Sequence, residues 1–88
     1  MTADGTVAAR ALAILRDVTR DDDVVTDLDV PLFDSGLLDS LAVVTLILEL
    51  EAAFGLVVSP ADLDRESWAT PRALVADVER RLAGGAPA

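Results

Sequence analysis

The chain has 88 residues, of which sixteen are acidic and seven are basic, and it contains no cysteine and no histidine. Its net charge of -9 excludes nucleic acid as a partner, because the phosphates would be repelled, and it disfavours anionic membrane surfaces. Without His, Cys or Lys, the chain can build no Ser-His-Asp triad, no thiolate or imidazole metal site and no Schiff base. We therefore expect a protein that is not an enzyme by itself.

A chain of this length is expected to form one small domain, here 1–88, with an ordered core at about 6–83 and a flexible tail at 84–88. The first residues lack the basic and apolar regions of a secretory signal. The longest apolar stretch is interrupted by polar residues and is too short to span a bilayer. We expect a cytoplasmic protein.

Apolar residues at helical spacing predict a first helix over residues 6–20. Its buried face is predicted to comprise Val7, Ala11, Ile14, Leu15 and Val18. Three consecutive aspartates, 21–23, then end this helix and open a long loop. A calcium-binding loop that starts at Asp21 would need Gly at position 26 and Glu at position 32, where Thr26 and Leu32 stand. We interpret the acidic run as a solvated loop.

The stretch from Asp34 to Leu41 organises the rest of the chain. Gly36 favours a turn, and Asp39 is a good N-cap for a second helix that runs from about Ser40 to Phe54. Gly55 is predicted to follow the helix as its C-terminal cap. Ser40 then lies at the loop–helix junction, where another enzyme can reach its hydroxyl. The alternative is that Ser40 is a plain serine at a helix start.

The second helix is apolar on two sides. One predicted face comprises Val43, Leu46, Ile47, Leu50 and Phe54, and the opposite face comprises Leu41, Val44, Leu48 and Ala52. A small bundle has little room to enclose a helix completely. We interpret Leu41, Val44 and Leu48 as a docking stripe for partners beside Ser40. The alternative is that these three side chains are ordinary core.

Two further helix starts follow. Ser59-Pro60-Ala61-Asp62 predicts a short third helix that continues toward Glu66, and Trp68 is expected to pack between this helix and the fourth. Thr70-Pro71 predicts the start of the fourth helix, which ends at Gly84. The predicted fold is all-α, a small four-helix bundle with three longer helices and one short one.

The motif Asp39-Ser40-Leu41 resembles the attachment site of acyl and peptidyl carrier proteins. Residues 32–40, 46–50 and 64–71 extend the resemblance to the D-alanyl carrier proteins of teichoic-acid D-alanylation. The resemblance implies a fold of acyl-carrier type. It also implies a 4′-phosphopantetheine arm on Ser40, flanked by Asp39 and Leu41 and attached from coenzyme A by a phosphopantetheinyl transferase. The docking face predicted from the second helix comprises Leu41, Val44, Thr45 and Leu48.

The implied function is that of a discrete carrier, which holds an aminoacyl group as a thioester on the arm. An adenylating amino-acid ligase would load it and a downstream acceptor enzyme would unload it. After Ser40, D-alanyl carriers have Met-Gly-Thr or Met-Gly-Ser, whereas this chain has Leu41-Ala42-Val43, so the partner enzymes can differ. The Arg- and Ala-rich composition is typical of high-GC genomes, in which such carriers often serve natural-product biosynthesis.

Two alternatives to an aminoacyl carrier stay open. One is a polyketide or fatty-acid acyl carrier protein, although fatty-acid carriers typically have acidic residues at the positions of Ala42 and Thr45. The other is a helical adaptor that binds a partner helix through the docking stripe. The adaptor requires no modification of Ser40, so a test of that modification separates it from the carriers.

Overall fold

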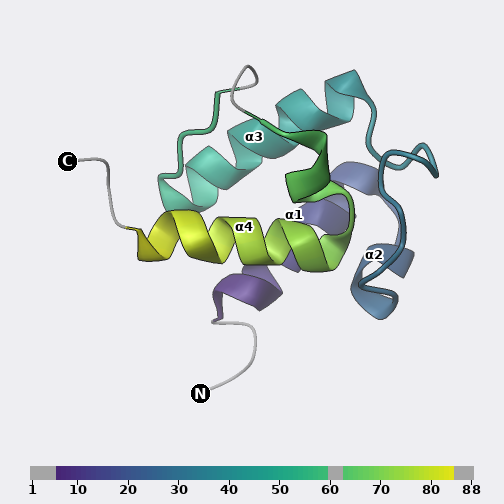
Figure 1. Cartoon of the computed structure of the whole chain (residues 1–88), viewed down its shortest axis with the longest axis horizontal. Coiled ribbons are helices and arrows are strands. Elements are labelled where there is room, and N and C mark those ends of the chain that lie inside the picture. The colour runs from purple at the N-terminus through teal and green to yellow at the C-terminus, as the bar shows by residue number, and fades with distance from the viewer. Residues whose placement is uncertain (1–5, 60–62, 85–88) are drawn as a thin grey trace.

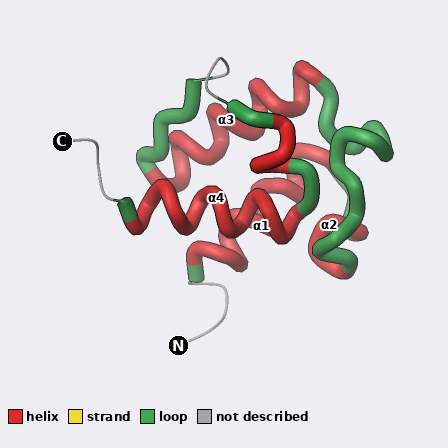
Figure 2. Tube along the Cα trace, viewed as in Figure 1, coloured by secondary structure: helices red, strands yellow, loops and turns green. Residues whose placement is uncertain are grey.

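The computed structural model describes residues 6–59 and 63–84, and this part of the chain is helical and contains no strand (Figures 1 and 2). The predicted all-α bundle with three longer helices is confirmed. The elements in chain order are α1 (Val7–Thr19), α2 (Asp23–Thr26), α3 (Ser40–Phe54), the 3-10 helix η3 (Arg65–Trp68) and α4 (Pro71–Ala83).

Helix α1 holds the bundle together, because it contacts α2, α3 and α4. Figure 1 shows it crossing behind α4. The hydroxyl of Thr6 accepts a hydrogen bond from the Ala9 N–H at 3.0 Å and caps the start of the helix. Arg20 ends it in a left-handed conformation, with φ of 58°. The predicted helix over 6–20 is therefore confirmed to within a residue at each end.

The prediction that a loop without helix follows the three aspartates is wrong. The Asp21 carboxylate accepts a hydrogen bond from the Asp23 N–H at 2.9 Å, which starts the single turn of α2. This turn buries Val24 completely. One buried apolar side chain and several local hydrogen bonds thus form a short helix that has no periodic pattern to reveal it.

The predicted third helix is also wrong in position. Residues 60–62, where we expected it to start, lie outside the described residues, as do residues 85–88 of the predicted tail. Leu63 and Asp64 are not helical, and η3 begins only at Arg65. The Asp64 carboxylate caps it by accepting from the Glu66 N–H at 3.1 Å.

Trp68 is fully buried and packs between η3 and α4, as predicted. Its indole N–H donates a 2.9 Å hydrogen bond to the Asp77 carboxylate, which is only 2% exposed. Asp77 also accepts from Arg80 and from Arg81, the latter at 2.8 Å. A buried charge is tolerated when it is paired and hydrogen-bonded in this way. The hydrogen bond between Trp68 and Asp77 attaches η3 to α4.

Ala69, between η3 and α4, and Arg72, at the start of α4, hold the long loop in place. The Leu32 N–H donates to the Ala69 carbonyl at 2.8 Å, and the Arg72 N–H donates to the Leu28 carbonyl at 2.9 Å. The Arg72 guanidinium forms an exposed ion pair with Asp29 at 3.0 Å. Its hydrogen bond and positive charge lower the pKa of the Asp29 carboxyl. The loop that leads into α3 is therefore tied to the start of α4.

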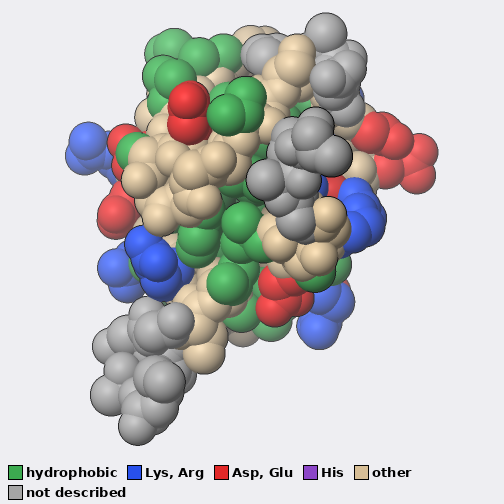
Figure 3. Space-filling model, turned by 90° about the vertical axis from the view of Figure 1, so that its left-hand side faces the viewer, with side chains coloured by type: hydrophobic (Ala, Val, Ile, Leu, Met, Phe, Trp, Pro, Cys, Tyr) green, Lys and Arg blue, Asp and Glu red, His purple; other side chains and the backbone are tan. Residues whose placement is uncertain are grey.

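The surface mixes apolar and charged side chains. On the face in Figure 3, hydrophobic side chains reach the surface in the middle, with acidic and basic side chains around them.

Within residues 6–59 and 63–84, no helix is both long enough and apolar enough to cross a bilayer.

The two faces of α3 predict effects of different size for the same substitution. Leu46 is fully buried and Leu48 is 58% exposed. Leu46→Ala should create a core cavity and lower the free energy of unfolding by about 2–5 kcal/mol. Leu48→Ala should lower it much less. Urea unfolding followed by circular dichroism measures both, and an equal loss of stability would show that Leu48 belongs to the core.

Candidate functional site

Two buried leucines set the position at which the chain enters α3. Leu32 and Leu38 are both buried, and the Leu38 N–H donates to the Leu32 carbonyl at 2.9 Å. Between them the chain makes a turn in which the Gly36 N–H donates to the Phe33 carbonyl at 3.1 Å. Gly36 has φ of 84°, which glycine adopts without steric cost. The predicted turn is confirmed, and the two leucines anchor it.

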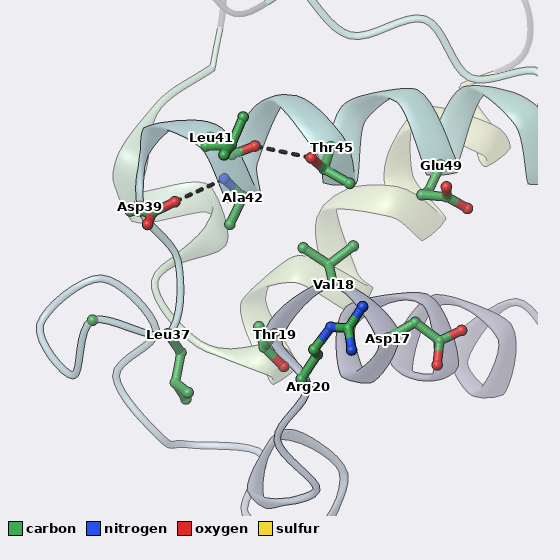
Figure 4. A pocket seen from close by; sticks show the side chains of 11 residues that line it. Asp17, Val18, Thr19, Arg20, Leu37, Asp39, Leu41, Ala42, Thr45 and Glu49 are labelled. Atoms are coloured by element: carbon green, nitrogen blue, oxygen red, sulfur yellow. Dashed lines mark hydrogen bonds between the residues drawn. The ribbon is translucent and has the colours of Figure 1, made fainter.

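Helix α3 begins immediately after this turn. The Asp39 carboxylate accepts a hydrogen bond from the Ala42 N–H at 2.8 Å, which confirms the predicted N-cap (Figure 4). Ser40 is the first residue of the helix and is exposed. Its hydroxyl forms no hydrogen bond with any residue in the described part of the chain. The hydroxyl is therefore accessible to another enzyme.

The other three serines lie in different settings. Ser35 lies in the loop, where its hydroxyl donates to the Leu32 carbonyl at 3.4 Å. Ser59 is exposed outside any helix, and Ser67 is half-buried within η3. Ser40 is thus the serine that combines an exposed, unbonded hydroxyl with the capped start of a long helix.

The predicted docking stripe is exposed along α3. Leu41, Val44 and Leu48 have 75%, 45% and 58% of their surface exposed, respectively. Thr45 is also exposed, and its hydroxyl donates to the Leu41 carbonyl at 3.1 Å (Figure 4). The alternative that these apolar side chains are ordinary core is therefore wrong. Ala52, further along the same side, is exposed too.

Two recesses open on either side of the start of α3. One, of about 720 Å³, lies between α1 and α3, and Arg20, Asp39, Leu41 and Thr45 are among its lining residues (Figure 4). The other, of about 510 Å³, is lined by Ser40 itself together with residues of the long loop, α3 and the segment around η3. Sequence reasoning missed both recesses, because each combines segments that are far apart in the chain.

Comparison with known proteins identifies this architecture. The family model described as a phosphopantetheine attachment site matches residues 9–78. The chain belongs to the phosphopantetheine carrier family. The carriers of this family bear a covalently attached 4′-phosphopantetheine and are not themselves catalytic. The helical adaptor that needs no modification is thereby set aside.

The relatives of this carrier include several D-alanyl carrier proteins. The protein of that name from Lacticaseibacillus casei is 45% identical over 78 residues, which cover 89% of this chain and 96% of the relative. The one from Enterococcus faecalis is 48% identical over 68 residues, with coverage of 77% and 87%. The one from Listeria innocua is 41% identical over 68 residues, again with coverage of 77% and 87%. The resemblance stated from the motifs is confirmed.

The exposed stripe predicts how the carrier responds to a charge placed on it. Leu48→Glu should leave a folded protein that a phosphopantetheinyl transferase uses poorly, because an ionised carboxylate resists burial in an apolar interface. We expect kcat/KM for modification to fall about tenfold or more, at least ~1.4 kcal/mol of lost interaction.

The matched control is Val57→Glu. Val57 lies outside the helices and is 74% exposed. Its substitution by Glu adds the same charge away from the stripe. This variant should be modified at the wild-type rate. Equal rates for both variants and wild type would contradict docking through Leu48.

Proposed function

We propose that this protein is a discrete aminoacyl carrier with the prosthetic group on Ser40. The observation that carries the proposal is the exposed, unbonded Ser40 hydroxyl at the capped start of α3, in a chain of this carrier family. The residues present fit the group. Asp39 and Leu41 flank the hydroxyl, and recesses on both sides leave room for an arm that begins there.

The composition of the chain agrees with this role. It contains no Cys and no Lys, so it offers neither a thiol nor a side-chain amine to hold an acyl group. When bound, the prosthetic group supplies a terminal thiol on which cargo is carried as a thioester. Ser40 needs exposure rather than activation by a neighbouring base, because a separate transferase modifies it.

The docking face is proposed to comprise Leu41, Val44, Thr45 and Leu48. An apolar centre with charged surroundings is typical of a transient protein interface. The net charge of -9 favours partners with Arg- or Lys-lined rims, which also speed the encounter. The partners in this proposal are a phosphopantetheinyl transferase, an adenylating amino-acid ligase and a downstream acceptor enzyme, all acting in the cytoplasm.

The proposed cargo is a small amino acid, and D-alanine is the first to test because the relatives are named for it. The described residues around Ser40 include no enclosed pocket that could select an amino acid. Selection therefore falls to the ligase, and the carrier contributes the arm and the docking face. Residues 41–43, which depart from the D-alanyl carrier pattern, lie on or beside this face.

The attachment site is tested by mass. Incubation with coenzyme A and a broad-range transferase should add one phosphopantetheinyl group to the wild type. Ser40→Ala should gain none while its circular dichroism spectrum stays helical, because the exposed hydroxyl makes no contact that folding needs. Peptide mapping should place the group on Ser40. A group found on Ser35, Ser59 or Ser67 would falsify the assignment.

The cargo is tested on the modified protein. We expect an ATP-dependent ligase encoded near the carrier to add one small amino acid as a thioester, read by intact mass across a panel of amino acids. D-alanine alone would support a cell-wall role, and another amino acid would indicate natural-product biosynthesis. Loading only with malonyl or long-chain acyl groups would contradict the aminoacyl proposal and indicate a polyketide or fatty-acid carrier.

A further inference from the structure

The recess of about 510 Å³ beside Ser40 combines apolar walls with one positive charge. Phe33, Val43 and Leu63 supply apolar side chains to it. Arg65 supplies a guanidinium, and among the described lining residues no other is basic. Ser40 and Arg65 thus face the same recess although they belong to different elements, α3 and η3.

Arg65 is held in place without using its hydrogen-bond donors. Its guanidinium carbon lies 4.6 Å from the centroid of the Phe33 ring, within the range of a cation–π interaction. With the residues that the structure describes, the Arg65 side chain forms neither an ion pair nor a hydrogen bond. A guanidinium has five N–H donors, and stacking on an aromatic ring leaves them available. The geometry is that of a preorganised anion-binding group.

Arg65 differs in this respect from the arginines of α4. Arg72 is paired with Asp29, and Arg80 and Arg81 are both paired with Asp77. The position of Arg65 is set by its own element, because the neighbouring Trp68 is buried and bonded to Asp77. The free guanidinium therefore sits on a firmly attached turn.

Charge explains what this guanidinium can bind. A phosphodiester on Ser40 would carry a negative charge directly beside the Asp39 carboxylate, in a chain whose net charge is already -9. A cation across the recess offsets that repulsion. Guanidinium groups match phosphate oxygens well, since two parallel N–H donors can bind two oxygens.

We propose that Arg65 binds the phosphodiester that joins the prosthetic group to Ser40, a role that rests on the proposed attachment at Ser40. Arg65 acts as a positioning residue and forms no covalent bond. Its contact directs the start of the arm over the recess and toward Val43 and Leu63. Leu41 and Leu48 do not line this recess. The arm can therefore rest on the carrier while most of the docking stripe stays open to a partner.

The experiment compares phosphorus NMR spectra of the modified protein in the wild type, Arg65→Gln and Arg65→Lys. We expect the phosphodiester resonance of Arg65→Gln to shift from the wild-type position, and Arg65→Lys to restore part of the difference. In 1 M NaCl the Debye length is only about 3 Å, so the wild-type resonance should move toward that of Arg65→Gln. The Arg65 Nε–H signal should also shift when the wild type is modified.

Arg20→Gln is the matched control. It removes the same charge from the recess on the α1 side, where Asp17 is also among the lining residues, and it should leave the phosphorus resonance unchanged. Circular dichroism of each variant before modification checks the fold. The salt response and the Nε–H signal are measured on the wild type, so a variant that fails to fold does not remove the test.

The outcomes separate this inference from the proposed function. If the wild type gains no mass at Ser40, the proposed attachment fails. If it gains the expected mass but Arg65→Gln has the wild-type phosphorus resonance and salt response, the attachment stands and the role of Arg65 is wrong.

Discussion

The hydrogen bond from the indole of Trp68 to the buried carboxylate of Asp77 ties together the parts of the molecule that present the site. It attaches η3 to α4, and Ala69 between them and Arg72 in α4 bond to the long loop at Leu32 and Leu28. That loop leads directly into the start of α3. The placement of Ser40 therefore depends on a contact between residues distant from it in the sequence, because a loop of this length needs tertiary anchors to hold one conformation.

Helix α3 serves two purposes because the bundle covers only one of its sides. Leu46, Ile47 and Leu50 are buried in the core, while Leu41 and Leu48 remain exposed. The first set stabilises the fold by removing apolar surface from water. The second set leaves apolar surface in contact with water in the isolated protein. Such exposure is expected of a surface that partner proteins cover. The exposed set begins at Leu41, next to Ser40, the proposed attachment residue.

The division of labour between the chain and its prosthetic group follows from the side chains that are present. The chain lacks the thiol, imidazole and amine groups on which most covalent chemistry depends. It supplies instead an accessible hydroxyl, an exposed apolar stripe on α3 and an acidic surface. The guanidinium of Arg65, stacked on Phe33, is an exception to the acidic character of the site, which is why we propose that it binds the phosphodiester.

The sequence by itself determined the three long helices and the position of Ser40 at a helix start. These features are local: apolar residues recur at helical spacing, and Thr6, Asp39 and Gly55 cap helix ends through bonds to nearby residues. The exposed stripe of α3 was predictable for the same reason, since a small bundle cannot enclose a helix that is apolar on two sides. The family followed from motifs that stand in continuous segments.

Only the tertiary structure decided the short helices and the surroundings of Ser40. Helix α2 forms around the buried Val24 and η3 around the buried Trp68. Each is a single turn, which is too short to show the helical spacing of apolar residues. Asp77 lies on the apolar side of α4, which indicates that a buried group pairs with it. No pattern in the neighbouring sequence identifies that group as Trp68. Phe33, Ser40 and Arg65 meet because the loop is bonded to the start of α4. Such contacts depend on how distant segments pack, which a pattern within one segment cannot specify.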